Sequence, residues 1–294
     1  MSEAVSQPSS NNKVSTKSLI YIGVVFLFLY CFFLIINLPA AWVVEQAKQR
    51  NMLPPNVNIS APTGTIWQGE AQYMRIANIN LNKVKWELSA TQLLLGNIDA
   101  NIKVDNSRQA QSLSMSGNIH LPIAALSPAQ TNHAPDSGNP AEASKNIITL
   151  DDFKLRAPAN QIAHYLTLPI DANLQGRFLI DIAQAELDIT ASNALRCELM
   201  QGDIVWQNAN ANVYGQFINL NAMDASLSCA ERNVTMAFNP NNKLGLDAVV
   251  KLVDNNQITI NGVMKPDASL PKSVHDAMQY LGKPNQQGQY TVEW

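Results

Sequence analysis

The chain has 294 residues, a formal net charge of −3, 46% hydrophobic residues and only 15% charged residues. It contains no dense cluster of lysine and arginine, which argues against nucleic acid as a partner, because phosphate binding needs concentrated positive charge. The low charge and the many Asn, Gln, Ser and Ala residues favour an exported protein, and the length allows one large domain or two modest ones.

The first predicted element is an uncleaved transmembrane anchor helix over residues 18–38. No charged residue lies between Lys17 and Glu45, and about 20 apolar residues span a hydrocarbon core of roughly 30 Å. A buried globular helix and a cleaved signal peptide are the alternatives. Globular helices are seldom apolar all round for so long, and signal peptides have apolar regions of only about 7–15 residues. The polar residues 1–17 are predicted to form a disordered cytoplasmic tail.

Residues 39–56 are predicted to be a juxtamembrane linker. Trp42 lies where aromatic rings prefer the membrane–water boundary, and Pro54 and Pro55 end any helix that continues past the membrane. Basic residues are nearly balanced on the two sides of the apolar segment, so they do not fix its orientation.

Residues 57–126 are predicted to form a first β unit, because apolar and polar residues alternate there as in half-buried strands. The phase of this alternation slips by one residue near Asn82 and Lys83, which predicts a turn or a bulge. Residues 127–149 are rich in proline and small polar residues that do not build a strand ladder, so they are predicted to be a flexible linker.

Residues 150–294 are predicted to form a second β unit with the same alternation. Two short helices are expected within it, over residues 159–166 and 272–281, and Gly282 and Pro284 close the second helix. Strand patterns that end in Pro122 and Pro266 resemble each other, which suggests a duplicated unit. The predicted fold is therefore mainly β, with two related, curved antiparallel sheets and minor short helices after the anchor.

Two of the three cysteines lie in the predicted soluble part. Cys31 is inside the anchor, where it is predicted to be an inert small apolar residue. Cys197 and Cys229 are 32 residues apart and are predicted to form a disulfide in an oxidising compartment such as the periplasm. Two separate buried thiols are the alternative.

The search for catalytic motifs predicts no enzyme and no cofactor. No Gly-x-Ser-x-Gly, His-Glu-x-x-His, phosphate-binding or dinucleotide-binding pattern occurs. Asp151 and Asp152 are interpreted as a solvated turn, and His164 as a partly exposed helix residue. The cysteine pair and the scattered histidines have no zinc-ligand spacing, so no metal site is predicted.

Two of the five tryptophans have similar local settings. Trp67 follows Gly64 in Gly-Thr-Ile-Trp-Gln-Gly, and Trp206 follows Gly202 in Gly-Asp-Ile-Val-Trp. Each pattern predicts a turn that enters a strand whose indole packs across the sheet. Simple core packing is one interpretation, and a groove for a partner or a lipid is the other.

In their order and spacing, these motifs resemble the protein N family of the bacterial type II secretion system. The anchor ends in Leu38-Pro39-Ala40, and the closing residue is Trp294. Between them, the residues that carry the resemblance, beside Cys197 and Cys229, are Gly64, Thr65, Trp67, Gly69, Trp86, Gly96, Gly202 and Trp206.

The resemblance implies an accessory component of the secretion machine in the bacterial inner membrane, with a cytoplasmic N-terminus and a periplasmic body. The implied role is assembly or stabilisation of the apparatus through contacts with the secretin or with inner-membrane platform subunits. A weaker resemblance to AsmA-like envelope proteins implies lipid binding or handling instead, and an envelope hydrolase is a distant third alternative.

Overall fold

The computed structural model describes residues 16–294 except 51–52, 54–55, 77–78, 106–112, 127–145, 164–171, 190–194, 214 and 254–256, and the side chains of residues 16, 18, 19, 172 and 213 are also not described. Several predictions lie outside this set: the tail up to residue 15, the Pro54-Pro55 stop, most of the 127–149 linker, and His164.

The described residues form a β structure with short helices after one long N-terminal helix. The helical elements are α1 (Thr16–Ile36), α2 (Ala40–Gln49), α3 (Ala90–Leu94), η1 (Ile123–Leu126), α4 (Ala159–Ala163), α5 (Lys272–Ala277) and η3 (Met278–Leu281). The strands are β1 (Val57–Gly64), β2 (Gln68–Ile76), β3 (Ile79–Leu88), β4 (Asn97–Val104), β5 (Ser114–Pro122), β6 (Ile147–Pro158), β7 (Ala172–Asp188), β8 (Arg196–Val213), β9 (Gln216–Ala230), β10 (Asn233–Phe238), β11 (Asp247–Val253), β12 (Gln257–Met264) and β13 (Tyr290–Glu293).

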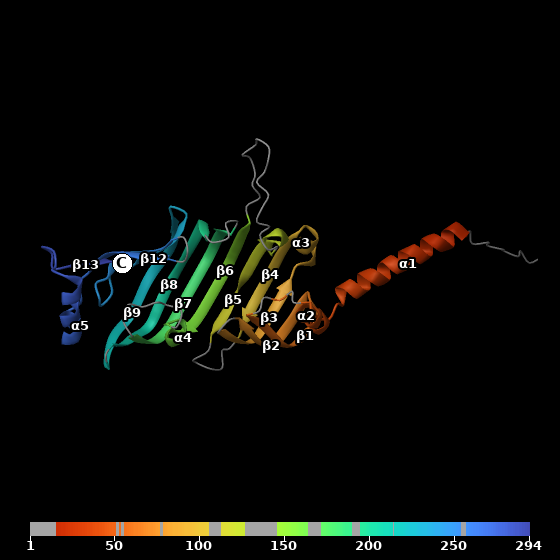
Figure 1. The fold of residues 1–294 in the computed structure, drawn as a ribbon. Helices are drawn as coiled ribbons and strands as arrows, with labels where there is room; N and C mark the ends of the chain where they lie inside the picture. Colours follow the sequence, from red (N-terminus) through yellow and green to blue (C-terminus); the bar gives the residue numbers. More distant parts are fainter. Residues whose placement is uncertain are drawn as a thin grey trace, which may run out of the picture.

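All 13 strands belong to one antiparallel sheet in which they follow one another in chain order. Figure 1 shows α1 projecting from the β1 end of this sheet, with α5 and β13 at the opposite end. The expected division into two sheets is wrong, because β6 pairs with β5 on one side and with β7 on the other. β6 also begins at Ile147, inside the linker predicted over residues 127–149.

One face of the sheet is apolar, as the alternation predicts. Directly paired residues of antiparallel strands place their side chains on the same face. One row of such pairs crosses the sheet from β1 to β10 and contains Pro62, Ala71, Val84, Val104, Met115, Leu155, Ile180, Ile204, Ala225 and Phe238. We call the face that carries this row the apolar face.

The opposite face carries polar side chains at the neighbouring positions, and we call it the polar face. Its corresponding row from β1 to β9 contains Thr63, Glu70, Lys85, Lys103, Ser116, Lys154, Asp181, Asp203 and Ser226. A sheet of this kind hides its apolar face from water only by curving or by taking up a covering element or ligand.

The predicted slip near Asn82 and Lys83 is present as a backbone kink. Lys83 has a φ of 53°, in the left-handed region. Leu81 and Val84 are therefore both buried, at 5% and 3% exposure, although they are separated by an odd number of positions. The pairing of β2 with β3 keeps the same offset on both sides of Lys83, so one left-handed residue, and not a turn or an inserted residue, changes the phase.

Three short helices pack against parts of the apolar face. α5 contributes Val274 and is followed by Met278 in a cluster with Leu220 and Met223 of β9. α4 places Ala159 against Leu174 and Ala211, and α2 lies over β1. The predicted helix over residues 272–281 is confirmed as α5 followed by η3. α4 confirms the described part of the helix predicted over residues 159–166.

The helix predicted over residues 18–38 corresponds to α1, whose described side chains from Ile20 to Ile36 are exposed. When only the residues with described side chains are counted, which leaves out residues 16, 18 and 19 of α1, no helix is long and apolar enough to cross a membrane.

Candidate functional site

An apolar groove lies between α2 and the apolar face of strands β1 to β5. Its volume is about 310 Å³, at the lower end of the range of small-molecule sites. Its lining is formed by Ala40, Val43, Val44, Ile59, Ile66, Met74, Ile76, Leu81, Val84, Trp86, Leu88, Ala100, Ile102 and Met115. A groove of this composition suits an aliphatic ligand or an apolar surface, and it has no groups for acid–base or nucleophilic chemistry.

Trp86 lies across Gly69 in the wall of this groove. A Cβ atom on Gly69 would lie 2.4 Å from Cζ2 of the Trp86 indole, so only glycine leaves room for the ring. The Nε1–H of Trp86 donates to the carbonyl oxygen of Ile66 at 3.1 Å. The indole therefore lies over the space left by Gly69, and a hydrogen bond at its edge fixes its orientation.

The Gly64–Gly69 segment turns β1 into β2. Gly64 has a φ of +82°, and a Cβ atom there would lie 2.6 Å from the carbonyl oxygen of Gln68, so the turn requires glycine. The amide of Thr65 donates to the Gln68 carbonyl at 2.9 Å, and the amide of Gln68 donates to Oγ1 of Thr65 at 3.1 Å. These bonds hold the turn in one shape.

The same turn fastens the end of α1 and the start of α2 to the sheet. The indole Nε1–H of Trp67 donates to the carbonyl oxygen of Ile35, in the last turn of α1, at 2.8 Å. The amide of Ile66 donates to the Leu38 carbonyl at 3.0 Å, and Pro39 forms an isolated bridge with Thr65. Trp67 is thus a contact between helix and sheet, at a separation that local sequence patterns do not reveal. We call this contact the junction.

Replacing Trp67 by Phe is expected to loosen the junction while keeping an aromatic ring. The lost hydrogen bond contributes about 1 kcal/mol, so the Ile66 amide is expected to exchange with solvent roughly fivefold faster. Hydrogen exchange of the peptide that contains Ile66 measures this change. Trp42→Phe is the control, since Trp42 on α2 is 57% exposed. Equal exchange in both variants would show that the Trp67 indole does not hold the junction.

Trp206 and Gly202 lie on β8, away from the groove lining. The indole of Trp206 stacks on Phe178 with ring centroids 5.4 Å apart, and its Nε1–H donates to the Gln175 carbonyl at 2.9 Å. A Cβ atom on Gly202 would lie 2.6 Å from the carbonyl oxygen of Asp181. These contacts fit core packing.

The structure therefore brings Gly64, Thr65, Trp67, Gly69 and Trp86 together at the junction and the groove. Gly96 is placed elsewhere, between α3 and β4, where its φ of +83° favours glycine. A functional role for any of these residues stays a prediction.

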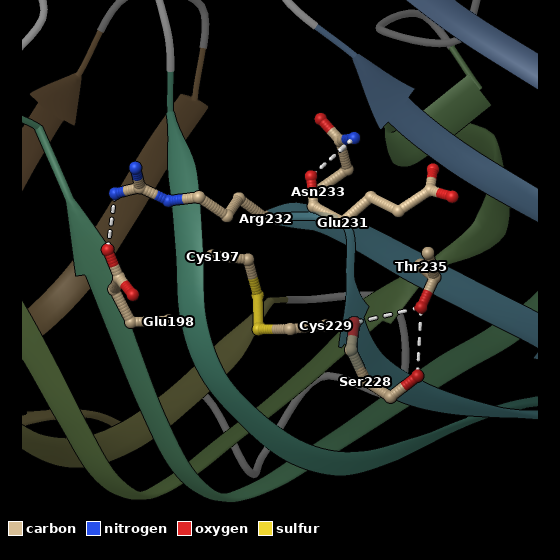
Figure 2. The surroundings of a disulfide bond; sticks show 8 residues. All are labelled: Cys197, Glu198, Ser228, Cys229, Glu231, Arg232, Asn233 and Thr235. Atoms are coloured by element: carbon tan, nitrogen blue, oxygen red, sulfur yellow. Dashed lines mark hydrogen bonds and ion pairs between the residues drawn. A yellow bond between two sulfur atoms is a disulfide. The ribbon is translucent and has the colours of Figure 1, made fainter.

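The predicted Cys197–Cys229 disulfide is confirmed, and it joins the neighbouring strands β8 and β9 (Figure 2). It lies beyond Gly202 and Leu227, the last pair of the β8–β9 ladder. The amide of Cys197 donates to the carbonyl oxygen of Arg232 at 2.8 Å. The disulfide thus holds the ends of two long strands together where their ladder has stopped.

Charged side chains surround the turn between β9 and β10, beside the disulfide. Arg232 bonds to the buried carboxylate of Asp188 at 3.3 Å and also to Glu198, as Figure 2 shows for Glu198. A hydrogen bond from Lys251 at 2.9 Å, together with its positive charge, holds the pKa of Glu231 below its usual value. The positive φ values of Glu231 and Arg232, 53° and 62°, are those of a tight hairpin turn.

Of the side chains considered for catalysis, the structure describes Asp151 and Asp152, and both belong to β6. Asp151 pairs with Gln184 across β6 and β7 on the polar face. Asp152 has a φ of 50° within β6, so it kinks a strand and does not form the predicted turn. In the part of the chain that the structure describes, no three His, Cys, Asp or Glu residues are placed to hold a metal ion.

Sequence reasoning missed the contribution of α2 to the groove. The available signal was the spacing of Ala40, Val43 and Val44, which is the i, i+3, i+4 pattern of a helix with one apolar side. That pattern indicates a packed helix, but it does not say which surface the helix covers.

The comparisons with known proteins point to one family. The family described as "Type II secretion system (T2SS), protein N" matches residues 55–293. The chain is similar to type II secretion system protein N of Vibrio cholerae, with 24% identity over 257 residues, which are 87% of this chain and 89% of that relative.

Two further relatives carry the same name. The protein from Aeromonas hydrophila is 24% identical over 286 residues, which are 95% of this chain and 98% of the relative. The protein from Klebsiella pneumoniae is 19% identical over 280 residues, which are 95% of this chain and 96% of the relative. No solved structure matches the chain.

Proposed function

Because the chain belongs to the type II secretion system protein N family, whose members are envelope-associated secretion components and not enzymes, we propose that it helps to assemble or stabilise the secretion apparatus. The contacts are made by the sheet body with other components, such as the secretin or inner-membrane platform subunits. The observation that carries this proposal is the match over residues 55–293, which includes the whole sheet.

We further propose that α1 anchors the protein in the inner membrane. It has 21 residues, which at about 1.5 Å each extend roughly 30 Å, the thickness of a hydrocarbon core. Its described side chains from Ile20 to Ile36 are apolar or uncharged and exposed on all sides of the helix, and this favours a lipid environment.

The proposed orientation places the N-terminus in the cytoplasm and the sheet in the periplasm. The Cys197–Cys229 disulfide supports it, because disulfides persist in oxidising compartments. The residues that precede α1 then lie in the cytoplasm.

The free edge of β13 is the proposed contact surface. The two edge strands of the sheet are β1 and β13. Two features of β1 hinder pairing with another strand: Pro62 lies in it, and the Nζ of Lys48 donates to its Ile59 carbonyl at 2.7 Å. Directly after β13, Trp294 exchanges both backbone hydrogen bonds with Ile260 of β12. By alternation the backbone groups of Thr291 point away from β12, where a partner strand can pair with them.

Replacing Thr291 by Pro is expected to abolish capture of partner subunits while the sheet stays folded. Proline is tolerated on an edge strand where its missing N–H would have pointed outward. Val292→Pro is the matched control that shows the effect of a folding defect, because Val292 pairs with Gly262 of β12 and proline there removes an N–H of the internal ladder. Unchanged capture by the Thr291→Pro variant would exclude the β13 edge as the contact surface.

The test of the function itself is cross-linking in living cells, followed by purification of the protein under denaturing conditions and identification of what it carries. Recovery of the secretin or of platform subunits is expected. Recovery of none of them, with stoichiometric phospholipid in a parallel gentle extraction, would contradict the assembly role.

Lipid handling is a second candidate function, and the apolar face favours it. This face runs from β1 to β10, and many of its side chains, such as Ile102, Leu155 and Ile180, are only partly buried. An aliphatic ligand on this face would remove apolar surface from water.

A further inference from the structure

We propose that the groove between α2 and strands β1 to β5 holds one acyl chain of a membrane phospholipid, which enters beside the junction. The proposal deepens the lipid-handling function and rests on α1 being a membrane anchor. It assigns an occupant and a point of entry to the groove.

The chemistry of the lining selects an aliphatic occupant. Among the described residues of the lining there is no charged side chain, and the one side-chain polar hydrogen, the Trp86 indole N–H, is bonded to the Ile66 carbonyl. A peptide in this groove would bury backbone polar groups without side-chain partners from the lining. A hydrocarbon chain needs no such partners, and a volume of about 310 Å³ suits a single slender chain.

The position of the groove favours a lipid that comes from the bilayer. α1 ends at Ile36, and Ala40, the first residue of α2, lines the groove and is 2% exposed. Only residues 37–39 separate the helix from the groove lining, and Pro39 is bridged to Thr65. With α1 in the membrane, the groove begins at the level of the lipid headgroups, so an acyl chain reaches it without crossing water.

α2 is held over the groove at both ends. Its N-terminal end is tied down by the Pro39–Thr65 bridge. Its C-terminal turn is tied down by Lys48, whose Nζ donates to the Ile59 carbonyl at 2.7 Å. Helix α2 is therefore fixed to the same β1–β2 hairpin that carries the junction. The groove is pre-formed in the absence of a ligand. Pre-formed sites bind with a smaller ordering cost.

Neighbouring residues that point to opposite faces of one strand provide matched probes. Met74 and Ile102 line the groove. The residue after each of them, Arg75 or Lys103, is exposed. A photoreactive benzoyl-phenylalanine is placed at one of these four positions at a time in the full-length protein. The protein is irradiated in vesicles of phosphatidylethanolamine and phosphatidylglycerol, and the adducts are identified by mass spectrometry.

Phospholipid adducts are expected at Met74 and Ile102, about tenfold or more above those at Arg75 and Lys103. Equal adducts on both faces would show that the groove has no preference for lipid. A protein adduct at Met74 or Ile102 would assign the groove to a polypeptide partner. Either result overturns the proposal.

A second measurement uses charge in place of a probe. Met74→Glu puts a carboxylate into the groove and is expected to lower phospholipid retained by the purified full-length protein about tenfold or more. Arg75→Glu makes the control, and both variants are checked for the Cys197–Cys229 disulfide as a marker of folding. Equal retention by the two folded variants overturns the proposal.

Failure of the anchor is detected separately by alkaline carbonate extraction. Protein released from membranes by carbonate contradicts the anchor, whatever the adducts show. Protein that stays in the membrane but gives no adduct at Met74 or Ile102 contradicts the acyl-chain site and leaves the anchor and the assembly role standing.

Discussion

Replacing both Cys197 and Cys229 by Ala is expected to lower the free energy of unfolding by about 3–4 kcal/mol. The disulfide closes a loop of 32 residues, which restricts the unfolded chain, and it joins strands β8 and β9 beyond the end of their ladder. Alanine is preferred to serine, because Cys197 is only 2% exposed and a serine hydroxyl would be buried there. Urea unfolding of the detergent-solubilised protein, followed by tryptophan fluorescence, measures the difference.

Cys31→Ala is the control for this experiment, since Cys31 lies exposed on α1 and takes no part in the disulfide. It is expected to leave the unfolding midpoint unchanged. An equal midpoint for the double variant and the wild-type protein would show that the sheet alone holds the ends of β8 and β9. Labelling of Cys197 in cells without reductant would also contradict the periplasmic orientation, because the thiol would then be free.

The two-faced character of the sheet could be predicted from the sequence, because a strand alternates its side chains with a period of two. The buried residues Ala100 and Val104 and the exposed Asn101 follow that rule. The kink at Lys83 was also visible, as a slip in phase. These features are local, and each strand carries its own signal.

The single sheet could not be predicted in the same way. Whether β5 pairs with β6 depends on how the chain returns after residues 127–145, and two halves with similar patterns look alike in one sheet or in two. The pairing of Met115 with Leu155 joins the halves across a long separation in sequence, and no local pattern encodes it.

The candidate site was only partly predictable, for a related reason. Gly64, Trp67 and Gly69 predict a tight turn, which the structure contains, but the Trp67 indole bonds to the end of α1 and does not pack across a strand. Their common role appears only when Trp67 meets Ile35, 32 residues away in the chain. Predicting the groove requires a further step, because Ala40, Val43 and Val44 line it only when α2 packs over the apolar face.

Trp206→Ala is expected to lower the free energy of unfolding by about 2–4 kcal/mol, less than for a fully buried tryptophan, because Trp206 is only partly buried. The substitution removes three kinds of contact at once. The indole stacks on Phe178, donates to the Gln175 carbonyl at 2.9 Å, and packs against the clusters that contain Met223 and Leu174. Trp206 therefore connects the apolar cluster beneath α5 with the cluster beneath α4.

Trp206→Phe separates these contributions, because it keeps a ring beside Phe178 and loses the hydrogen bond, for an expected cost of about 1 kcal/mol. A double-mutant cycle with Phe178→Ala is expected to give a coupling of about 0.5–1.5 kcal/mol between the two rings. The same urea titration measures all these variants. Additive effects would mean that the rings do not stabilise each other. If Trp206→Ala lowers the free energy of unfolding by less than about 1 kcal/mol, the clusters beneath α5 and α4 are stable without this side chain. Trp206 would then be available to bind a partner.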